Sequence, residues 1–377
     1  MALRLGLKHA LRASIARPAV ARSFSVSQHA ADKLLMDFPE QREGLNIEFN
    51  WSLADDDVTP HGEAYRNLKW ARLQELAKDA KPAGKKASIE QVDVSVSFAE
   101  FQSTFEKVTN YLSLADEIFA HDGAVGSFKD DRTRVRVISD SPVVALFAQN
   151  ILVRVPTKDV HAQRPIVVYV ATGGDFAGKE PKALMLLDKD ENDALFAKVV
   201  ITGAADLRTV MNAVGLAKQK LVENSETESV VLPCDVVVKN DKSALVFNAD
   251  ATRSSAVASG LLYAAHQNIW SPAGVTSVFG GAVVNDAKVA SKQALPIEDG
   301  VAVHVPCNNL VDHPKAAFFF QKSGGVKSIS AQEAASLLIQ SGADVDAEKF
   351  AGLLKNADTK TYVVSSQTDI EATLAKL

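Results

Sequence analysis

The sequence contains no apolar run long enough to cross a membrane. A spanning helix needs about 20 consecutive apolar residues, and no segment of the 377 residues approaches that length. Cysteine is also scarce: the chain has two, Cys234 and Cys307, each directly after a proline in an apolar run. Their separation offers no metal-ligand spacing, so we expect two buried thiols without a disulfide. These absences predict a soluble protein, or one that contacts a membrane only through its partners.

Acidic residues are missing from the beginning of the chain, where none precedes Asp32. Five basic residues recur there among leucines, alanines and serines, a composition typical of organelle transit peptides. Arg22-Ser23-Phe24-Ser25 resembles a mitochondrial processing site. We therefore predict a transit peptide over 1–24, cleaved after Phe24, and a destination in the mitochondrial matrix or on the matrix face of the inner membrane. The alternative is a basic surface helix of the folded protein.

Over the whole chain, basic residues are fewer than acidic residues. Loss of the five basic residues of the leader would take the formal net charge from −5 to −10. Affinity for nucleic acid comes mainly from Lys and Arg contacts to phosphates. A nucleic acid is therefore not an expected partner, and a subunit of the mitochondrial ribosome is disfavoured.

The remaining composition is that of a globular protein, with 47% apolar and 23% charged residues and no internal repeat. Apolar periodicity predicts helices at 98–112, 142–150, 206–223 and from 252 to about 266. Capping-box patterns at Ser330/Glu333 and Thr368/Glu371 predict two more. Strands are predicted at 134–138, 151–155, 166–171, 183–187, 198–201, 230–239, 243–247, 301–305, 316–320 and 361–365. Because Asn240-Asp241 predicts a hairpin, we expect an α/β fold with mixed sheets.

The segment 25–87 differs in composition from the rest of the chain. Residues 59–63 have the composition of a helix start, and 65–80 carry apolar residues at helical spacing, including Trp70. Lys81-Pro82-Ala83-Gly84-Lys85-Lys86 would end this helix. We predict a helical N-terminal arm followed by a linker, with 50–78, including Trp51 and Trp70, as a docking element.

The stretch SALVFNADATRSSA at 243–256 has the layout of a phosphate-binding loop, in which a strand turns into a helix beginning near Thr252. A working loop needs glycines, whose backbone N–H groups surround phosphate, and a lysine followed by a hydroxyl residue. Thr252, Ser254 and Ser255 supply hydroxyls, but the stretch has neither glycine nor lysine. The sequence thus predicts the frame of a phosphate site without its chemistry.

Several segments, in the same order along the chain, resemble ATP-dependent phosphoenolpyruvate carboxykinase. They are DGAVG at 122–126, RVRVI at 134–138, ALFAQNILVR at 145–154, LPCD at 232–235, ALVF at 244–247, Gly274-Val275, Gly280-Gly281, Val305-Pro306 and 313–333. The resemblance runs roughly from Val92 to Val364, with regions shortened between Gly281 and Pro296 and after Ser366. It implies a two-lobed fold with a degenerate P-loop, an N-terminal lobe at 88–225 and a truncated nucleotide-fold-like lobe at 226–377.

That family transfers phosphate between a nucleotide and an oxaloacetate-derived enolate with two metal ions, and the resemblance places its functional residues on positions that lack them. The substrate arginine falls at 83–86, where there is none. The family's tyrosine and metal-binding lysine fall within 202–213, nearest Asp206, Met211 and Asn212. Its metal-binding histidine corresponds to Asp235, the three loop glycines to Asn248, Ala251 and Arg253, and the loop lysine to Ser254. The metal-binding aspartate corresponds to Ala265 and its neighbour to His266, while Trp270 keeps the family's tryptophan. A further catalytic arginine has no counterpart that we can place.

Each missing contact would contribute about 1.5–3 kcal/mol, and about 1.4 kcal/mol is tenfold in rate. We therefore expect a pseudoenzyme with no catalytic, cofactor-binding or metal-binding residues and no small-molecule substrate. The hypothesis is an accessory subunit of a large mitochondrial complex, with ATP synthase or a respiratory complex favoured and other subunits as partners.

Three alternatives stay open at this point. The first is a remodelled nucleotide- or anion-binding protein or enzyme, with Arg253 as the anion ligand instead of a solvated or partner-facing residue. The second is a residual metal site at Asp235 and His266, and the third is a free-standing structural protein. His313 is expected to fix a turn before the strand at 316–320 and not to act in catalysis.

Overall fold

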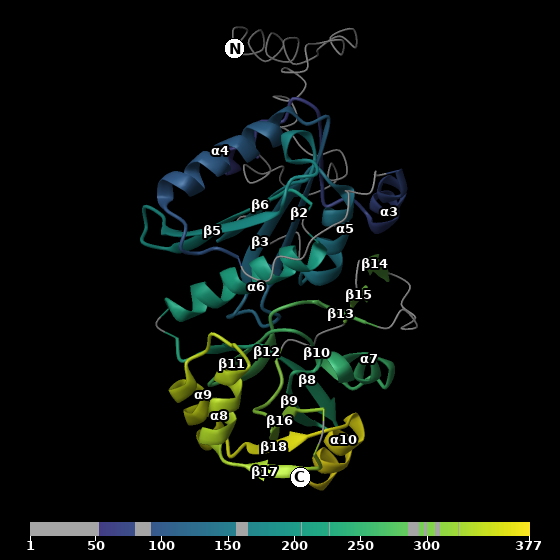
Figure 1. The fold of residues 1–377 in the computed structure, drawn as a ribbon, viewed down its shortest axis with the longest axis vertical. Coiled ribbons are helices and arrows are strands. Elements are labelled where there is room, and N and C mark those ends of the chain that lie inside the picture. Colours follow the sequence, from purple (N-terminus) through teal and green to yellow (C-terminus); the bar gives the residue numbers. More distant parts are fainter. Residues whose placement is uncertain are drawn as a thin grey trace, which may run out of the picture.

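The computed structural model describes residues 53–79, 92–155, 165–204, 206–225, 227–285, 294–297, 300–305, 310–322 and 324–377. The proposed leader, its cleavage site, Trp51, the linker at 80–87 and Cys307 lie outside these residues. The described part forms an elongated molecule of two lobes stacked along its long axis (Figure 1). None of the helices described is long and apolar enough to cross a bilayer.

The first lobe is built on a six-stranded sheet with strand order β1-β2-β3-β4-β6-β5. Its strands are β1 (Glu63–Arg66), β2 (Glu117–Val125), β3 (Thr133–Ser139), β4 (Ile166–Ala171), β5 (Lys182–Lys189) and β6 (Leu195–Thr202). The pairs β2–β3 and β5–β6 are antiparallel, whereas β1–β2, β3–β4 and β4–β6 are parallel. The prediction of a mixed α/β fold is confirmed.

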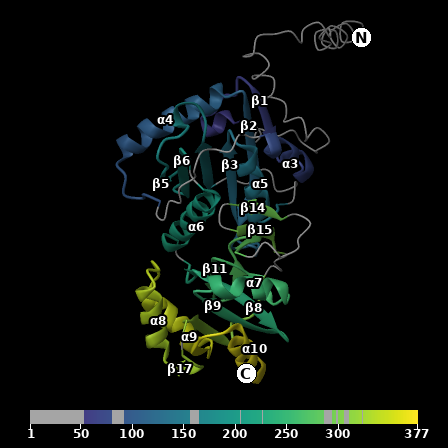
Figure 2. The same ribbon diagram turned by 45° about the vertical axis from the view of Figure 1, so that its right-hand side comes forward.

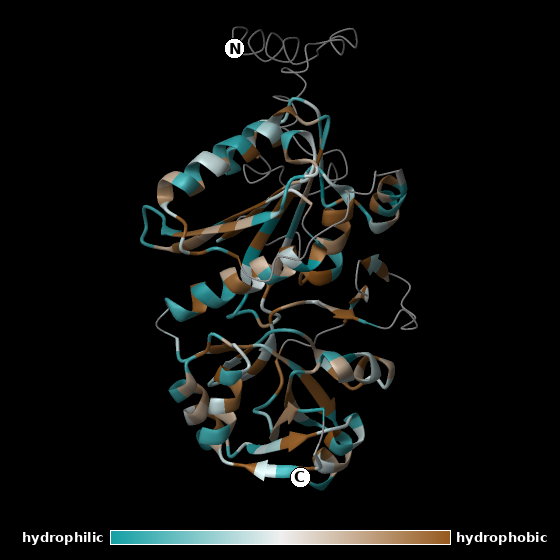
Figure 3. Cartoon of the chain, viewed as in Figure 1, coloured by the Kyte–Doolittle hydropathy of each residue, from teal (hydrophilic) through white to brown (hydrophobic). Residues whose placement is uncertain are grey.

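Helices cover both faces of this sheet. All residues of β4 are buried, and they alternate: Ile166 and Val168 face one core, and Val167 and Tyr169 face the other. The first core is completed by α3 (Trp70–Asp79), α5 (Pro142–Ile151) and α6 (Leu207–Glu223), the second by α4 (Phe98–Leu114). Along α4, hydrophobic and hydrophilic residues alternate in patches, as a helix with one solvent-exposed face requires (Figure 3).

The second lobe has its own six-stranded sheet, in the order β10-β8-β9-β16-β18-β17. The strands are β8 (Cys234–Lys239), β9 (Lys242–Phe247), β10 (Leu262–Ala264), β16 (Ala316–Phe320), β17 (Lys327–Ile329) and β18 (Lys360–Val364). Helices α8 (Ala331–Gln340) and α9 (Ala347–Asn356) cover one face, and α7 (Asp250–Ala258) and α10 (Gln367–Lys376) cover the other.

Two three-stranded sheets lie between the lobes. One contains β7 (Val230–Leu232), β11 (Asn268–Ser271) and β12 (Gly274–Ser277), and the other contains β13 (Gly281–Val284), β14 (Leu295–Ile297) and β15 (Gly300–His304). Ile269, Phe279 and Ala302 belong to the same hydrophobic cluster as Met211 and Val214 of α6. The core of the first lobe therefore continues into the part of the chain beyond residue 226.

The predicted helical arm is wrong for residues 53–68. Glu63–Arg66 is a strand parallel to β2 with alternating burial, and a short 3-10 turn, Ala54–Asp56, precedes it. Arg66 is buried and pairs with Asp122 of β2 at 2.6 Å, which holds this segment in the sheet. The helix starts only at Trp70, whose ring packs on the first core. Trp70 is thus engaged within its own chain and is not part of a separate arm.

Other differences have local causes. Because α5 continues to Ile151, the strand predicted at 151–155 reduces to one bridge, from Val153 to Ala124. Proline has no N–H for a ladder, and Pro233 divides the strand predicted at 230–239 into β7 and β8, which belong to different sheets. The helix expected to reach 266 ends at Ala258, since Gly260 takes a left-handed conformation, with φ of 70°.

Two of the three turn and cap predictions are confirmed. Asn240 and Asp241 have φ of 50° and 61° and join β8 to β9 in the predicted hairpin. Ser330 and Glu333 form the predicted capping box. The cap of the last helix is Ser366 and not Thr368, which lies inside α10.

Candidate functional site

The strand-turn-helix at 243–256 is present, and its helix begins two residues earlier than predicted. Strand β9 runs between β8 and β16 with Ala244–Phe247 buried, and α7 starts at Asp250. Asn248 makes the turn with φ of 57°, a left-handed conformation that glycine adopts at least cost and asparagine tolerates. The loop therefore keeps a sharp turn without a glycine.

Two backbone donors and one hydroxyl in the first turn of α7 bond to a single carbonyl of the same loop. The N–H groups of Thr252 and Arg253 both donate to the Ala249 carbonyl, at 2.9 and 2.8 Å. The Thr252 hydroxyl donates to the same oxygen at 3.1 Å, and its side chain is buried. A phosphate loop turns such groups toward the anion. Here these three groups are bonded to the Ala249 carbonyl instead.

Arg253 is buried, which contradicts its prediction as a solvated or partner-facing residue. Its Nε donates to the two carboxylate oxygens of Asp235 at 2.8 and 3.1 Å. Its Nη1 donates to Asp250 Oδ1 at 2.7 Å. Burial lowers the pKa of Arg253, but the Asp235 carboxylate outweighs it and the net shift is upward, so the guanidinium stays charged. Two carboxylates explain how an arginine is tolerated at 6% exposure.

Asp235 and His266 are both engaged by the protein itself. Asp235 accepts the His266 backbone N–H at 2.9 Å, in addition to its bonds from Arg253. His266 Nε2 accepts the Val283 N–H at 2.8 Å, and burial together with Arg253 holds the pKa of the imidazole well below its ordinary value. Among the residues described, no group of three or more His, Cys, Asp or Glu could hold a metal ion. The residual metal site is not supported at these two residues.

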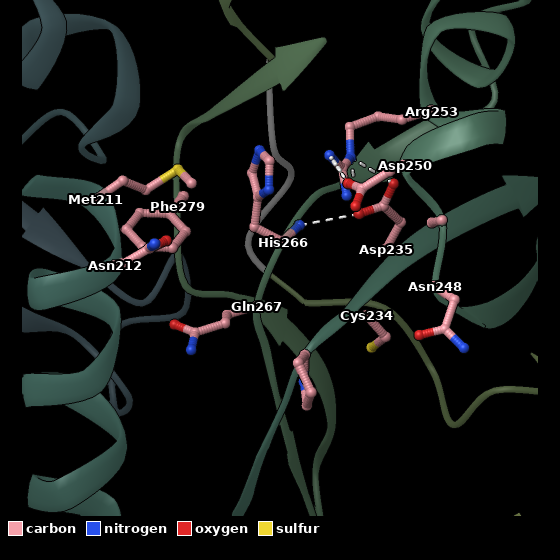
Figure 4. A pocket seen from close by; sticks show the side chains of 12 residues that line it. Met211, Asn212, Cys234, Asp235, Asn248, Asp250, Arg253, His266, Gln267 and Phe279 are labelled. Atoms are coloured by element: carbon pink, nitrogen blue, oxygen red, sulfur yellow. Dashed lines mark hydrogen bonds and ion pairs between the residues drawn. The ribbon is translucent and has the colours of Figure 1, made fainter. Parts of the chain in front are cut away.

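A cleft of about 270 Å³ lies beside this ion pair, between α6 of the first lobe and the loop of the second (Figure 4). Its lining residues are Met211, Asn212, Pro233, Cys234, Asp235, Asn248, Ala249, Asp250, Arg253, His266, Gln267 and Phe279. Burial raises the pKa of the Cys234 thiol, which stays protonated and free, as predicted for a core cysteine.

The structure brings together six of the positions that the resemblance selected: Met211, Asn212, Asp235, Asn248, Arg253 and His266. It does not bring Asp206, Ala251, Ser254 and Ala265 to the cleft. Asp206 instead caps α6 by accepting the Thr209 N–H at 2.8 Å. Sequence reasoning missed Gln267 and Phe279, for which the only signal was their position beside His266 and Gly280.

The charges of the cleft do not suit a polyphosphate. Asp235 and Asp250 contribute two negative charges, Arg253 contributes one positive charge, and His266 is neutral. An incoming anion would therefore meet a net negative charge, where phosphoryl transfer needs cationic groups that are free to contact phosphate.

The sequence predicted that His313 fixes a turn before β16, but the structure shows it bonded to β11 and to the turn after β11. Its Nδ1 accepts the Nε1 proton of the buried Trp270 at 3.0 Å. Its Nε2, which then carries the proton, donates to the Pro272 carbonyl at 3.1 Å. The imidazole thus ties the β11–β12 turn to the segment before β16.

Comparison with protein families gives one match. The family of phosphoenolpyruvate carboxykinase, of the ATP type, matches residues 79–188. Over this stretch, less than half of the chain, the sequence is phosphoenolpyruvate carboxykinase-like. The match covers α4, β2, β3, α5, β4 and most of β5. The mixed sheets of the molecule fit the fold of this family. The loop at 243–256 lies outside the match, and its similarity to the family is carried only by the collinear segments of the sequence. Comparison with curated proteins gave no match.

Proposed function

We propose that this carboxykinase homologue is non-catalytic and acts as a structural accessory subunit of a large mitochondrial complex, with the ATP synthase or a respiratory complex favoured. The observation that carries the proposal is the buried ion pair of Arg253 with Asp235, 2.8 Å long, at the loop where a nucleotide phosphate and its metal would be held. The chain's own guanidinium and carboxylate meet each other there.

A nucleotide phosphate at this loop would compete with the Asp235 carboxylate for the guanidinium of Arg253. A phosphate that drew Arg253 away from Asp235 would leave this carboxylate, which is 1% exposed, buried without its cationic partner. Breaking a buried pair in this way costs about 3–5 kcal/mol. A phosphate contact to a guanidinium contributes about 1.5–3 kcal/mol. The exchange is unfavourable, so the pair supports loss of nucleotide binding.

The scaffold role is supported by what the fold retains. Both sheets have both faces covered, and one hydrophobic cluster joins the first lobe to the small sheets. Such a body presents fixed surfaces to partners after its site is lost, since fold and function are separable. The acid-poor leader supports the matrix address.

The catalytic part of the proposal is tested with the purified mature chain. MgATP, MnADP and phosphoenolpyruvate, each at millimolar concentration, are expected to leave the melting temperature unchanged. A ligand that bound, present at 100 times its Kd, would stabilise the folded chain by about 2.7 kcal/mol and raise the melting temperature. The rival function is nucleotide or anion binding, which the open cleft beside Arg253 favours. A rise in melting temperature that Asn212→Leu abolishes would establish this rival and overturn the proposal.

The assembly part is tested by gentle detergent solubilisation of mitochondria, native separation and identification of co-migrating chains. Migration in the megadalton range with subunits of one complex is expected. Migration near the monomer mass, below the 40.4 kDa of the full chain, would contradict the scaffold role.

A further inference from the structure

Helix α6 lies between the two lobes in both views of the molecule (Figures 1 and 2). It belongs to the first lobe, and its Met211 and Asn212 form one wall of the cleft. From Arg208 to Lys220 the helix rises about 18 Å, at about 1.5 Å per residue. It is long enough to contact the rest of the chain at separate points along the cleft.

Both ends of α6 are bonded to the later part of the chain. Near its beginning, Arg208 Nη2 donates to Asn285 Oδ1 at 3.2 Å, directly after β13. Near its end, Lys220 Nζ pairs with Asp344 Oδ2 at 2.8 Å, in the connection between α8 and α9. The adjacent Gln219 donates through Nε2 to the Asp344 carbonyl. These contacts lie on either side of the cleft-lining residues in the sequence of the helix.

The middle of α6 makes a close approach that depends on glycine. A Cβ on Gly215 would lie 2.1 Å from Gln267 Oε1 and 3.2 Å from Phe279 Cζ. Both neighbours belong to the lining of the cleft. A larger residue at 215 would therefore have to displace the Gln267 side chain and would press on the Phe279 ring.

We propose that α6 is a clasp that holds the two lobes at one separation through contacts of the chain's own residues. Relative motion is the default for lobes joined by polar contacts. Here contacts at Asn285, Gln267 and Asp344 restrain the helix near its beginning, middle and end, and the core of the first lobe continues into the small sheets at the junction. The cleft then has a fixed width and does not open and close around a ligand, whatever the cellular role of the protein.

The first test uses the unmodified chain. Small-angle X-ray scattering is expected to fit one arrangement of the lobes, unchanged by MgATP or phosphoenolpyruvate. A profile that requires a mixture of open and closed forms, or one that contracts when MgATP is added, would overturn the clasp. This outcome is distinct from failure of the proposed function, which depends on co-migration and ligand-induced stabilisation.

The second test uses matched variants and hydrogen exchange read by mass spectrometry. Gly215→Val is expected to enlarge the radius of gyration and speed exchange in β12 at least tenfold. Gly352→Val in α9 is the control, because nothing lies within 4 Å of a Cβ there. If Gly215→Val does not fold, Gly215→Ala is compared with Gly215→Ala/Gln267→Ala. Removing the Gln267 amide is expected to restore wild-type exchange, and equal exchange in both variants would contradict the close-approach argument.

The third test addresses the end of the helix. Lys220→Ala is expected to speed exchange at 343–346, whereas Lys189→Ala, which removes the pair with Asp193 in the β5–β6 hairpin, leaves this segment unchanged. Equal exchange in the two variants would show that the Lys220 contact does not restrain α6.

Discussion

At the scale of single residues, Arg253 determines the electrostatic properties of the cleft. An arginine in the first turn of a helix after a buried strand suggests an anion ligand or an exposed side chain. The structure gives it two carboxylate partners, Asp235 at 2.8 Å and Asp250 at 2.7 Å. Arg253 is therefore a counter-ion to carboxylates of its own chain. Its removal should reduce the stability of the protein more than it affects any ligand binding.

Arg253→Met keeps most of the side-chain volume and removes the charge. We expect a loss of about 3–5 kcal/mol in the free energy of unfolding at pH 7, because Asp235 remains buried without its partner. Arg253→Met/Asp235→Asn is expected to recover most of this loss. Asp250→Asn is the control, since that carboxylate is 74% exposed, and its effect should be much smaller. Urea unfolding of the four proteins measures these differences.

The same variant should show a pH dependence of known sign. Burial raises the pKa of Asp235, and Arg253 opposes that shift. Without Arg253, the pKa of folded Asp235 lies above its unfolded value of about 4. Such a group favours folding below the unfolded pKa, and that contribution is lost as pH rises through the folded pKa. The deficit of Arg253→Met relative to wild type should therefore grow between pH 4 and 7, and a constant deficit would argue against an ionised, unpaired Asp235.

His313 offers a second residue-scale prediction. His313→Phe removes the acceptor for the buried Trp270 N–H and should cost about 1–3 kcal/mol. His313→Asn keeps an acceptor oxygen and should cost less. Thermal unfolding followed by tryptophan fluorescence compares the two, and equal losses would mean that packing, not the hydrogen bond, is what the imidazole supplies.

At the scale of elements, the helix boundaries are set by caps that bond the first turn. Ser366 accepts the Asp369 N–H at 3.1 Å, whereas the Thr368 position of the sequence pattern is inside the helix. Two cap patterns, one beginning at Ser366 and one at Thr368, overlap in the sequence. The pattern alone does not show which of the two residues is the cap. The choice is made by where β18 ends, at Val364, and by Ile370 and Leu374 packing on the second sheet.

Ser366→Ala should therefore destabilise the protein by about 1 kcal/mol, while Thr368→Ala should change stability by less than about 0.5 kcal/mol. Chemical unfolding of both variants, with Ser330→Ala as a positive control for a cap in α8, measures the difference. A larger loss for Thr368→Ala than for Ser366→Ala would contradict this assignment of the cap.

At the scale of the whole molecule, the two lobes are joined through the small sheets, which contribute residues to the cores of both. The cluster that contains Val168 of β4 and Val214 of α6 also contains Phe279 and Ala302. Each lobe would expose apolar surface if it unfolded alone. We expect one cooperative unfolding transition, with equal calorimetric and van't Hoff enthalpies. Two resolved transitions in scanning calorimetry would mean that the junction contributes little.

Much of the fold was accessible from the sequence, because its signals are local. The buried strands β4 and β16 and the helices α4 and α6 were predicted from apolar runs and apolar periodicity. The strand Glu63–Arg66 could not be found in this way, since it is short and carries Arg66. That residue is buried only because Asp122, on a strand distant in sequence, neutralises it.

By itself, the sequence determined the mixed α/β class, the similarity to phosphoenolpyruvate carboxykinase over 79–188, and the absence of glycine and lysine from the loop at 243–256. These are properties of residue types in order along the chain. Only the tertiary structure decided that Arg253 is buried against Asp235 and that α6 closes the cleft at Gly215. Burial, charge pairing and close approach depend on which distant segments meet, and a one-dimensional pattern does not carry that information.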